Sequence, residues 1–171
     1  PYYDRTIIDV TAKESGFDPK YIERAEQTTT TSFLYNLAIN GMYTQPLTDQ
    51  LFSAECRVIK ALADKGQCVI VGRCADYVLK DYPNVLSVFI HAPKEYCLEG
   101  AAKKHSMSPK ELERFINKTD KHRAEYYKYH TGREWTDARN YDLCLNSGKL
   151  GFEKCVEEIK AYIKVRFGET L

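Results

Sequence analysis

The stretch that decides the fold is QCVIVGRCADYVL, from Gln67 to Leu79. Its four consecutive apolar residues, Cys68 to Val71, predict a strand that is buried on both faces, which is typical of a parallel sheet covered by helices. Gly72 follows the strand and allows a sharp turn into the next helix. We therefore expect Arg73 at the carboxyl end of the sheet, where open α/β folds bind their ligands.

Arg73 has two interpretations from its position alone. A guanidinium group is a fork of donors suited to phosphate or carboxylate, so this residue is a candidate for holding an anionic ligand. The other interpretation is a surface arginine that pairs with Asp76, three residues further along the chain. The sequence leaves both interpretations open.

The composition is that of an ordinary soluble globular protein. The 171 residues are 43% apolar and 29% charged, and we expect one domain spanning residues 1–171. The formal net charge of +1 gives no support for a nucleic-acid or membrane partner. No apolar run approaches the roughly 18 residues of a membrane span, and no signal peptide precedes Pro1, so we expect a cytoplasmic protein.

The cysteines and histidines do not suggest a metal site. The six cysteines form no C-x-x-C pair, and several lie inside apolar runs, as small buried residues do in a reducing compartment. His122 and His130 stand eight residues apart, and no cysteine lies at a ligand spacing around them. We therefore expect no metal ligands among these side chains.

The apolar pattern predicts an α/β protein with a parallel sheet flanked by helices. Strands are expected at residues 1–3, 68–71, 85–90 and 143–145, and helices at 4–16, 48–65, 94–105, 108–129 and 152–167, with a further helix beginning at Asp18-Pro19. Residues 27–45 are rich in apolar and aromatic side chains without clean periodicity. They are either a segment that covers a pocket or an ordinary helical hairpin on the core.

Residues 117–135, NKTDKHRAEYYKYHTGREW, form a basic and tyrosine-rich segment. Helical spacing places Arg123 between Asp120 and Tyr127, which is how a phosphate-binding arginine would be held. A solvated basic helix face is the simpler explanation. Binding of nucleic acid through interleaved basic and aromatic residues is a third possibility, which the near-neutral net charge disfavours.

Four segments together resemble the bacterial cytidylate kinase-like family, relatives of the nucleoside monophosphate kinases: VIVGRCADYVL, NVLSVFIHAP, KTDKHRAEYYKYHTGREW and YDLCLNSGKLG. The resemblance covers nearly the whole chain and implies a phosphate-binding-loop (P-loop) kinase fold. The acceptor nucleotide would be approached by Arg73 and Asp76 and, from segment 27–45, by Phe33, Tyr35 and Tyr43. A lid at residues 108–135 would close over the transferring phosphate with Lys118, Lys121, Arg123 and Arg133. Lys149 and Gly151 would border the donor base.

One element of such kinases is missing from residues 1–171. They hold the donor phosphates in a glycine-rich loop between a first strand and a first helix, and this sequence contains no G-x-x-x-x-G-K run. The strand before that loop is central in related sheets, so its absence would leave unpaired strand edges on both sides. We therefore expect that this N-terminal strand and loop lie upstream of Pro1 or are supplied in another way.

The expected activity is transfer of the γ-phosphoryl group of ATP, with Mg²⁺, to a nucleoside monophosphate, with CMP or dCMP as the acceptor that the resemblance implies. The expected partners are small-molecule nucleotides, and the sequence does not give the oligomeric state. The alternative is a catalytically silent nucleotide-binding or regulatory module of the same fold. An intact glycine-rich loop would favour the enzyme, and a degenerate one the silent module.

Overall fold

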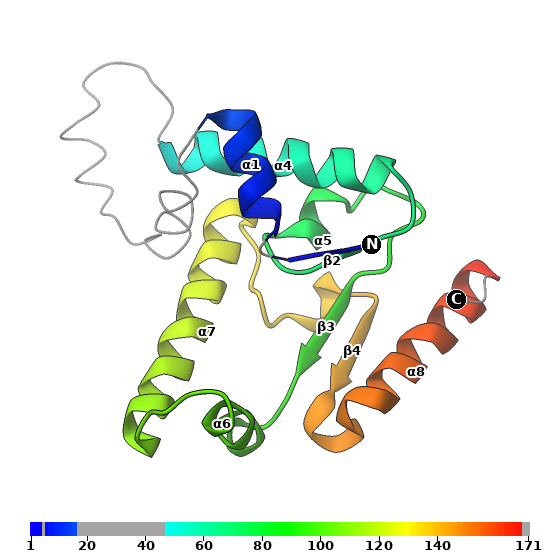
Figure 1. Cartoon of the computed structure of the whole chain (residues 1–171). Coiled ribbons are helices and arrows are strands. Elements are labelled where there is room, and N and C mark those ends of the chain that lie inside the picture. The colour runs from blue at the N-terminus through cyan, green and yellow to red at the C-terminus, as the bar shows by residue number, and fades with distance from the viewer. Residues whose placement is uncertain (5, 17–46, 169–171) are drawn as a thin grey trace. The chain divides into compact units, whose positions relative to one another are not determined.

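The computed structural model describes residues 1–4, 6–16 and 47–168, which form helices and short parallel strands (Figure 1). The helix expected at Asp18-Pro19 and the segment 27–45, with Phe33, Tyr35 and Tyr43, lie outside the described residues. The chain divides into two compact units. The first unit comprises Pro1–Asp81 and His122–Glu134, and the second comprises Tyr82–Lys121 and Trp135–Leu171.

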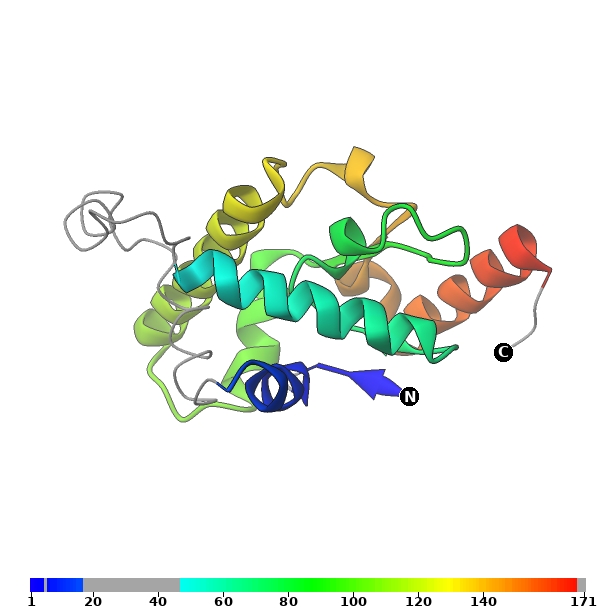
Figure 2. The ribbon, with the colours of Figure 1, turned by 90° about the horizontal axis from the view of Figure 1, so that it is seen from above.

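The first unit is built on one parallel strand pair and the helices beside it. Strand β1 (Tyr2–Tyr3) pairs with β2 (Val69–Ile70), so that Tyr2 lies opposite Val69. Its described helices are α1 (Thr6–Ser15), α4 (Leu47–Asp64), the short α5 (Ala75–Val78) and the C-terminal part of α7 (Pro109–Thr131). Helix α1 packs across α4, as two perpendicular views show (Figures 1 and 2).

The core of the first unit lies between α1 and α4. Helix α4 has the expected apolar stripe, and Leu51, Val58 and Ile59 are each at most 4% exposed. Leu51 meets Ile8 and Ala12 of α1 in one buried cluster. Each large apolar side chain buried in this way contributes about 1.5–3 kcal/mol to folding, so this contact fixes the position of α4 on α1.

Strand β2 is not buried on both faces, so this part of the sequence-based expectation is wrong. Val69 is 59% exposed and Val71 is 42% exposed, and Tyr2 of the neighbouring strand is 64% exposed. Side chains alternate between the faces of a strand, so these three residues share one open face of the sheet. An apolar run does not distinguish a strand covered on both faces from a strand covered on one.

The second unit holds a second parallel strand pair. Strand β3 (Val88–His91) runs beside β4 (Leu143–Asn146), from Val88 opposite Leu143 to His91 opposite Asn146. The unit also contains α6 (Lys94–Ala102), the N-terminal part of α7, the 3₁₀ helix η1 (Ala138–Asn140) and α8 (Ser147–Phe167). Helix α8 packs on β4 (Figure 1), although Val156 on its expected apolar stripe is 51% exposed.

The junction between β4 and α8 is tightly built. The Asn146 side chain accepts a hydrogen bond from the backbone N–H of Gly148 (3.1 Å), and the Ser147 hydroxyl donates to the carbonyl of His91 (3.2 Å). A Cβ atom at Gly148 would lie 2.5 Å from Cδ of Pro93, so only glycine fits there. Gly151 (φ 77°, ψ 170°) then interrupts the helix, so that residues 147–150 form a turn of their own.

Both strand pairs are parallel and flanked by helices, which confirms the predicted α/β class and the parallel pairing. The described strands form two separate pairs, β1-β2 and β3-β4. Among the described helices, none combines the length and the apolar character that crossing a membrane requires.

Candidate active site at the end of β2

The turn after β2 has an unusual backbone. Gly72, Arg73 and Cys74 all have positive φ angles, of 78°, 52° and 56°. The left-handed conformation costs roughly 1–2 kcal/mol for a residue that is not glycine. Two such residues in succession persist only where surrounding contacts hold them, and residues held in this way cluster at functional sites.

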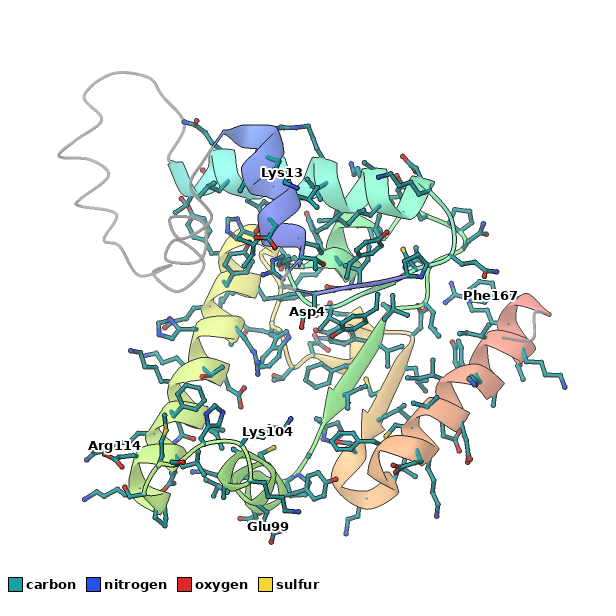
Figure 3. All side chains as sticks on the ribbon, viewed as in Figure 1. Asp4, Lys13, Glu99, Lys104, Arg114 and Phe167 are labelled. Carbon is teal, nitrogen blue, oxygen red and sulfur yellow. The ribbon has the colours of Figure 1, made fainter. Side chains whose placement is uncertain are left out.

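The side chain of Arg73 is held inside the first unit. Its Nη1 donates a hydrogen bond to the backbone carbonyl of Asp4 (3.1 Å) and lies 3.9 Å from the Asp4 carboxylate. Its Nε lies 3.7 Å from Oε1 of Glu55, and the side chain is 10% exposed. Asp4 lies where β1 leads into α1 (Figure 3), so Arg73 joins three elements of the unit. The interpretation of Arg73 as a surface residue is therefore wrong.

Asp76 contacts α7. The hydroxyl of Tyr127 donates a hydrogen bond of 2.6 Å to Oδ2 of Asp76. Burial raises the pKa of Asp76, and the Tyr127 hydrogen bond and the charge of Arg133 oppose that rise. Tyr127 is itself 4% exposed, so this pair fastens the short helix α5 to α7.

Two cations lie over the ring of Tyr77. The guanidinium carbon of Arg133 is 5.2 Å from the ring centroid, and Nζ of Lys80 is 4.8 Å from it. Both distances are within the range of a cation–π contact. Arg133 is exposed to solvent and follows Gly132 (φ 70°), where α7 ends as expected. An exposed positive charge therefore lies near the raised-pKa carboxyl group of Asp76.

His130 lies in an aromatic cluster between α4 and α7. Its ring stacks on Phe52 at 4.0 Å and meets Tyr126 and Tyr129 edge-on at 4.5 and 4.8 Å. Burial lowers the pKa of His130 from 6.5 to about 4, and the charge of Asp49 opposes this shift only partly. His130 is therefore neutral at neutral pH and acts as an aromatic packing residue.

Replacing His130 by phenylalanine is expected to flatten the pH dependence of stability between about pH 4 and 6.5. Within that window the unfolded chain binds a proton that folded His130 does not, so its contribution to the free energy of unfolding falls as the pH falls. Phenylalanine keeps the ring against Phe52 and removes the titration. Urea unfolding at several pH values would measure this, and equal slopes for both proteins would contradict it.

The remaining predicted site residues are distributed over both units. Arg123 is exposed on α7 within the first unit, together with Arg73, Asp76 and Arg133. Lys118, Lys121, Lys149 and Gly151 belong to the second unit, and all three lysines are exposed. The structure therefore places Arg73, Asp76, Arg123 and Arg133 in one unit, and Asp76 makes a hydrogen bond to α7. Phe33, Tyr35 and Tyr43 lie outside the described residues.

Glu55 and Tyr126 are linked to the candidate site residue Arg73, and sequence reasoning did not select them. The Tyr126 hydroxyl donates to Oε2 of Glu55 at 2.6 Å, and Glu55 is 1% exposed. The sequence signal for Glu55 is that a charged residue stands on the otherwise apolar stripe of α4.

Comparison with known proteins places this arrangement in a family. Residues 1–149, which include both strand pairs and α7, match the sequence profile of the cytidylate kinase-like family. The chain belongs to the cytidylate kinase-like family. Membership suggests a nucleotide kinase-like function, and it confirms the resemblance carried by the Gly-Arg turn and the basic tyrosine helix.

A solved structure has a similar fold. The crystal structure of an uncharacterized protein from Eubacterium ventriosum ATCC 27560 superposes with a TM-score of 0.67 at 23% sequence identity. The match covers 96% of this chain and 97% of that chain. At this identity the likeness concerns the fold alone. No curated protein matches the chain.

Proposed function

We propose that this member of the family is a nucleoside monophosphate kinase that transfers the γ-phosphoryl group of ATP to CMP or dCMP. The observation that carries the proposal is the family match over residues 1–149, which contains every arginine that we assign to the reaction. Those arginines are Arg73, at the end of β2, and Arg123 and Arg133, on α7 and just beyond it.

The proposed reaction requires the protein to position both substrates and to neutralise the charge of their phosphates. An oxygen of the acceptor phosphate attacks the γ-phosphorus in line, the bond between that phosphorus and the β,γ-bridging oxygen breaks, and ADP leaves. Phosphoryl transfer needs little covalent chemistry from side chains, so cations that meet the developing charge supply most of the catalysis. In our proposal Arg73 holds the acceptor phosphate, Arg123 and Arg133 meet the transferring group, and closure of residues 108–135 excludes water.

In our proposal Mg²⁺ reaches the site together with the phosphates of ATP. Among the described residues, no group of three or more His, Cys, Asp and Glu side chains is arranged to hold a metal ion. Mg²⁺ in kinases is bound largely by substrate phosphates and water. The described residues do not supply its ligand set, so we assign no step of the reaction to metal ligands of this chain.

Binding of the donor requires a glycine-rich phosphate-binding loop, which residues 1–171 do not contain. We propose that the kinase site includes such a loop together with its strand. A loop of this kind would present its backbone N–H groups to the donor phosphates.

A coupled ADP-release assay on the full-length protein tests the proposal. CMP, dCMP, UMP, AMP and GMP are offered separately with ATP and Mg²⁺. We expect turnover with CMP or dCMP to exceed turnover with the purine nucleotides at least tenfold. ADP release that does not depend on any acceptor would contradict kinase activity toward nucleoside monophosphates.

A second candidate function is a catalytically silent nucleotide-binding module. The observation in its favour is that Arg73 lies against the carboxylates of Asp4 and Glu55, which partly neutralise its charge. The silent module would bind CMP in calorimetry without releasing ADP in the assay above. Turnover with CMP would exclude it.

A further inference from the structure

We propose that Glu55 is a positioning residue of this site: it fixes the guanidinium group of Arg73 and ties it to Tyr126 on α7. Affinity for the phosphate of the acceptor then depends on Glu55, although Glu55 itself does not touch the acceptor. The role in acceptor binding rests on the proposed function, whereas the positioning of Arg73 is a property of the fold.

The environment of Glu55 makes its charge costly. Glu55 is 1% exposed and lies on the buried stripe of α4, one turn after Leu51 and three residues before Val58. Removing an ionised carboxylate from water is strongly unfavourable. A leucine or methionine would fill the same stripe without that cost, so packing alone does not explain a glutamate here.

The two oxygens of Glu55 face two different elements. Oε1 lies 3.7 Å from Nε of Arg73, in the turn after β2, and Oε2 accepts the 2.6 Å hydrogen bond from Tyr126 on α7. Oε2 therefore makes a hydrogen bond to α7, whereas Oε1 makes an ion pair with Arg73 and accepts no hydrogen bond from the described residues. The charge of Glu55 is therefore explained by the residues that it connects.

The strained turn shows why Arg73 needs to be held. Arg73 and Cys74 are both in the left-handed conformation, which is strained for residues other than glycine. The contacts of Arg73 with Glu55 and with the Asp4 carbonyl oppose relaxation of the turn. If the carboxylate of Glu55 is removed, we expect the guanidinium to sample other positions.

Tyr126 extends the connection to a second arginine of the proposed reaction. Arg123 lies three residues before Tyr126, on the same helix and within the same unit. The hydrogen bond between Tyr126 and Glu55 therefore fastens the helix that carries Arg123 to the residue that fixes Arg73. We therefore expect a change at Glu55 to weaken acceptor affinity, through Arg73, more than it lowers turnover.

The test compares Glu55→Gln and Tyr126→Phe with wild type and with Tyr129→Phe. Glutamine keeps the size and one oxygen of Glu55 but removes its charge. Tyr129 provides a matched control, because its hydroxyl donates to Asp49 at 3.1 Å, on the same pair of helices but away from Glu55. Calorimetry measures CMP affinity, steady-state kinetics separates KM for CMP from kcat, and NMR follows exchange of the Arg73 Nε–H proton with water.

We expect Glu55→Gln to weaken CMP binding and raise KM for CMP about tenfold, while kcat changes less than threefold. Exchange of the Arg73 Nε–H proton should accelerate at least tenfold in Glu55→Gln, and Tyr126→Phe should move both readouts in the same direction by less. Tyr129→Phe should match wild type. The Arg73 resonance is identified by its loss in Arg73→Lys.

The experiment distinguishes failure of the positioning role from failure of the proposed function. If wild type binds CMP and Glu55→Gln binds it equally well with unchanged KM, the positioning role is overturned and the proposed function stands. If wild type binds no nucleoside monophosphate, the proposed function and the role in acceptor binding fail together, and Nε–H exchange alone decides whether Glu55 fixes Arg73. Should Glu55→Gln not fold, Tyr126→Phe decides the same question, because unchanged exchange and affinity there would overturn the proposal.

Discussion

Replacing Arg123 by alanine is expected to lower kcat for phosphoryl transfer by about 10²-fold or more. Arg123 is exposed on α7, so a phosphate group can reach its side chain from solvent. In the proposed reaction it meets negative charge that grows in the transition state, and groups of this kind change kcat more than KM. Steady-state kinetics with ATP and CMP on the full-length protein measures both constants.

The control for Arg123 is Arg57→Ala. Arg57 is also exposed and also lies on a helix of the first unit, α4, but it has no role in the proposed site. We expect its kcat to remain within twofold of wild type. Turnover by Arg123→Ala within twofold of wild type would remove Arg123 from the mechanism, whereas equal losses in both variants would indicate a general effect of surface charge.

Much of the fold was predictable from the sequence because its signals are local. The apolar stripe of α4 and the glycines that end α4 and α7 predicted those helices to within two residues of their observed limits. The parallel pairing followed from strands that are separated by helices. The open face of β2 was not predictable, because what covers a sheet depends on segments that are distant in the sequence.

The site was only partly predictable for the same reason. The Gly-Arg pair made Arg73 a candidate, because glycine indicates a sharp turn and arginine is able to bind anions. Its partners Asp4 and Glu55 are 69 and 18 positions away, and no local pattern joins them to it. The sequence shows Tyr126 and Tyr127 only as members of a tyrosine-rich segment. The tertiary structure shows that Tyr126 donates a hydrogen bond to Glu55 and Tyr127 donates one to Asp76.

Replacing Arg73 by methionine is expected to destabilise the protein by about 3 kcal/mol, because removing one partner of a buried pair leaves an uncompensated charge. Methionine keeps much of the volume of the arginine stem, so the change tests charge more than packing. The side chains of Arg73 and Glu55 are 10% and 2% exposed. The midpoint and slope of urea unfolding give the free energy of unfolding.

Two further variants separate burial from distance as the origin of this effect. The exposed pair Lys128–Glu134 is closer, at 2.5 Å, but its side chains are 63% and 64% exposed, so Lys128→Ala should cost less than about 0.5 kcal/mol. Adding Glu55→Gln to Arg73→Met removes the orphaned charge, so the double variant should be more stable than the sum of the two single losses predicts. Strict additivity would mean that Arg73 and Glu55 do not compensate each other, and the pair would then have no part in holding the strained turn.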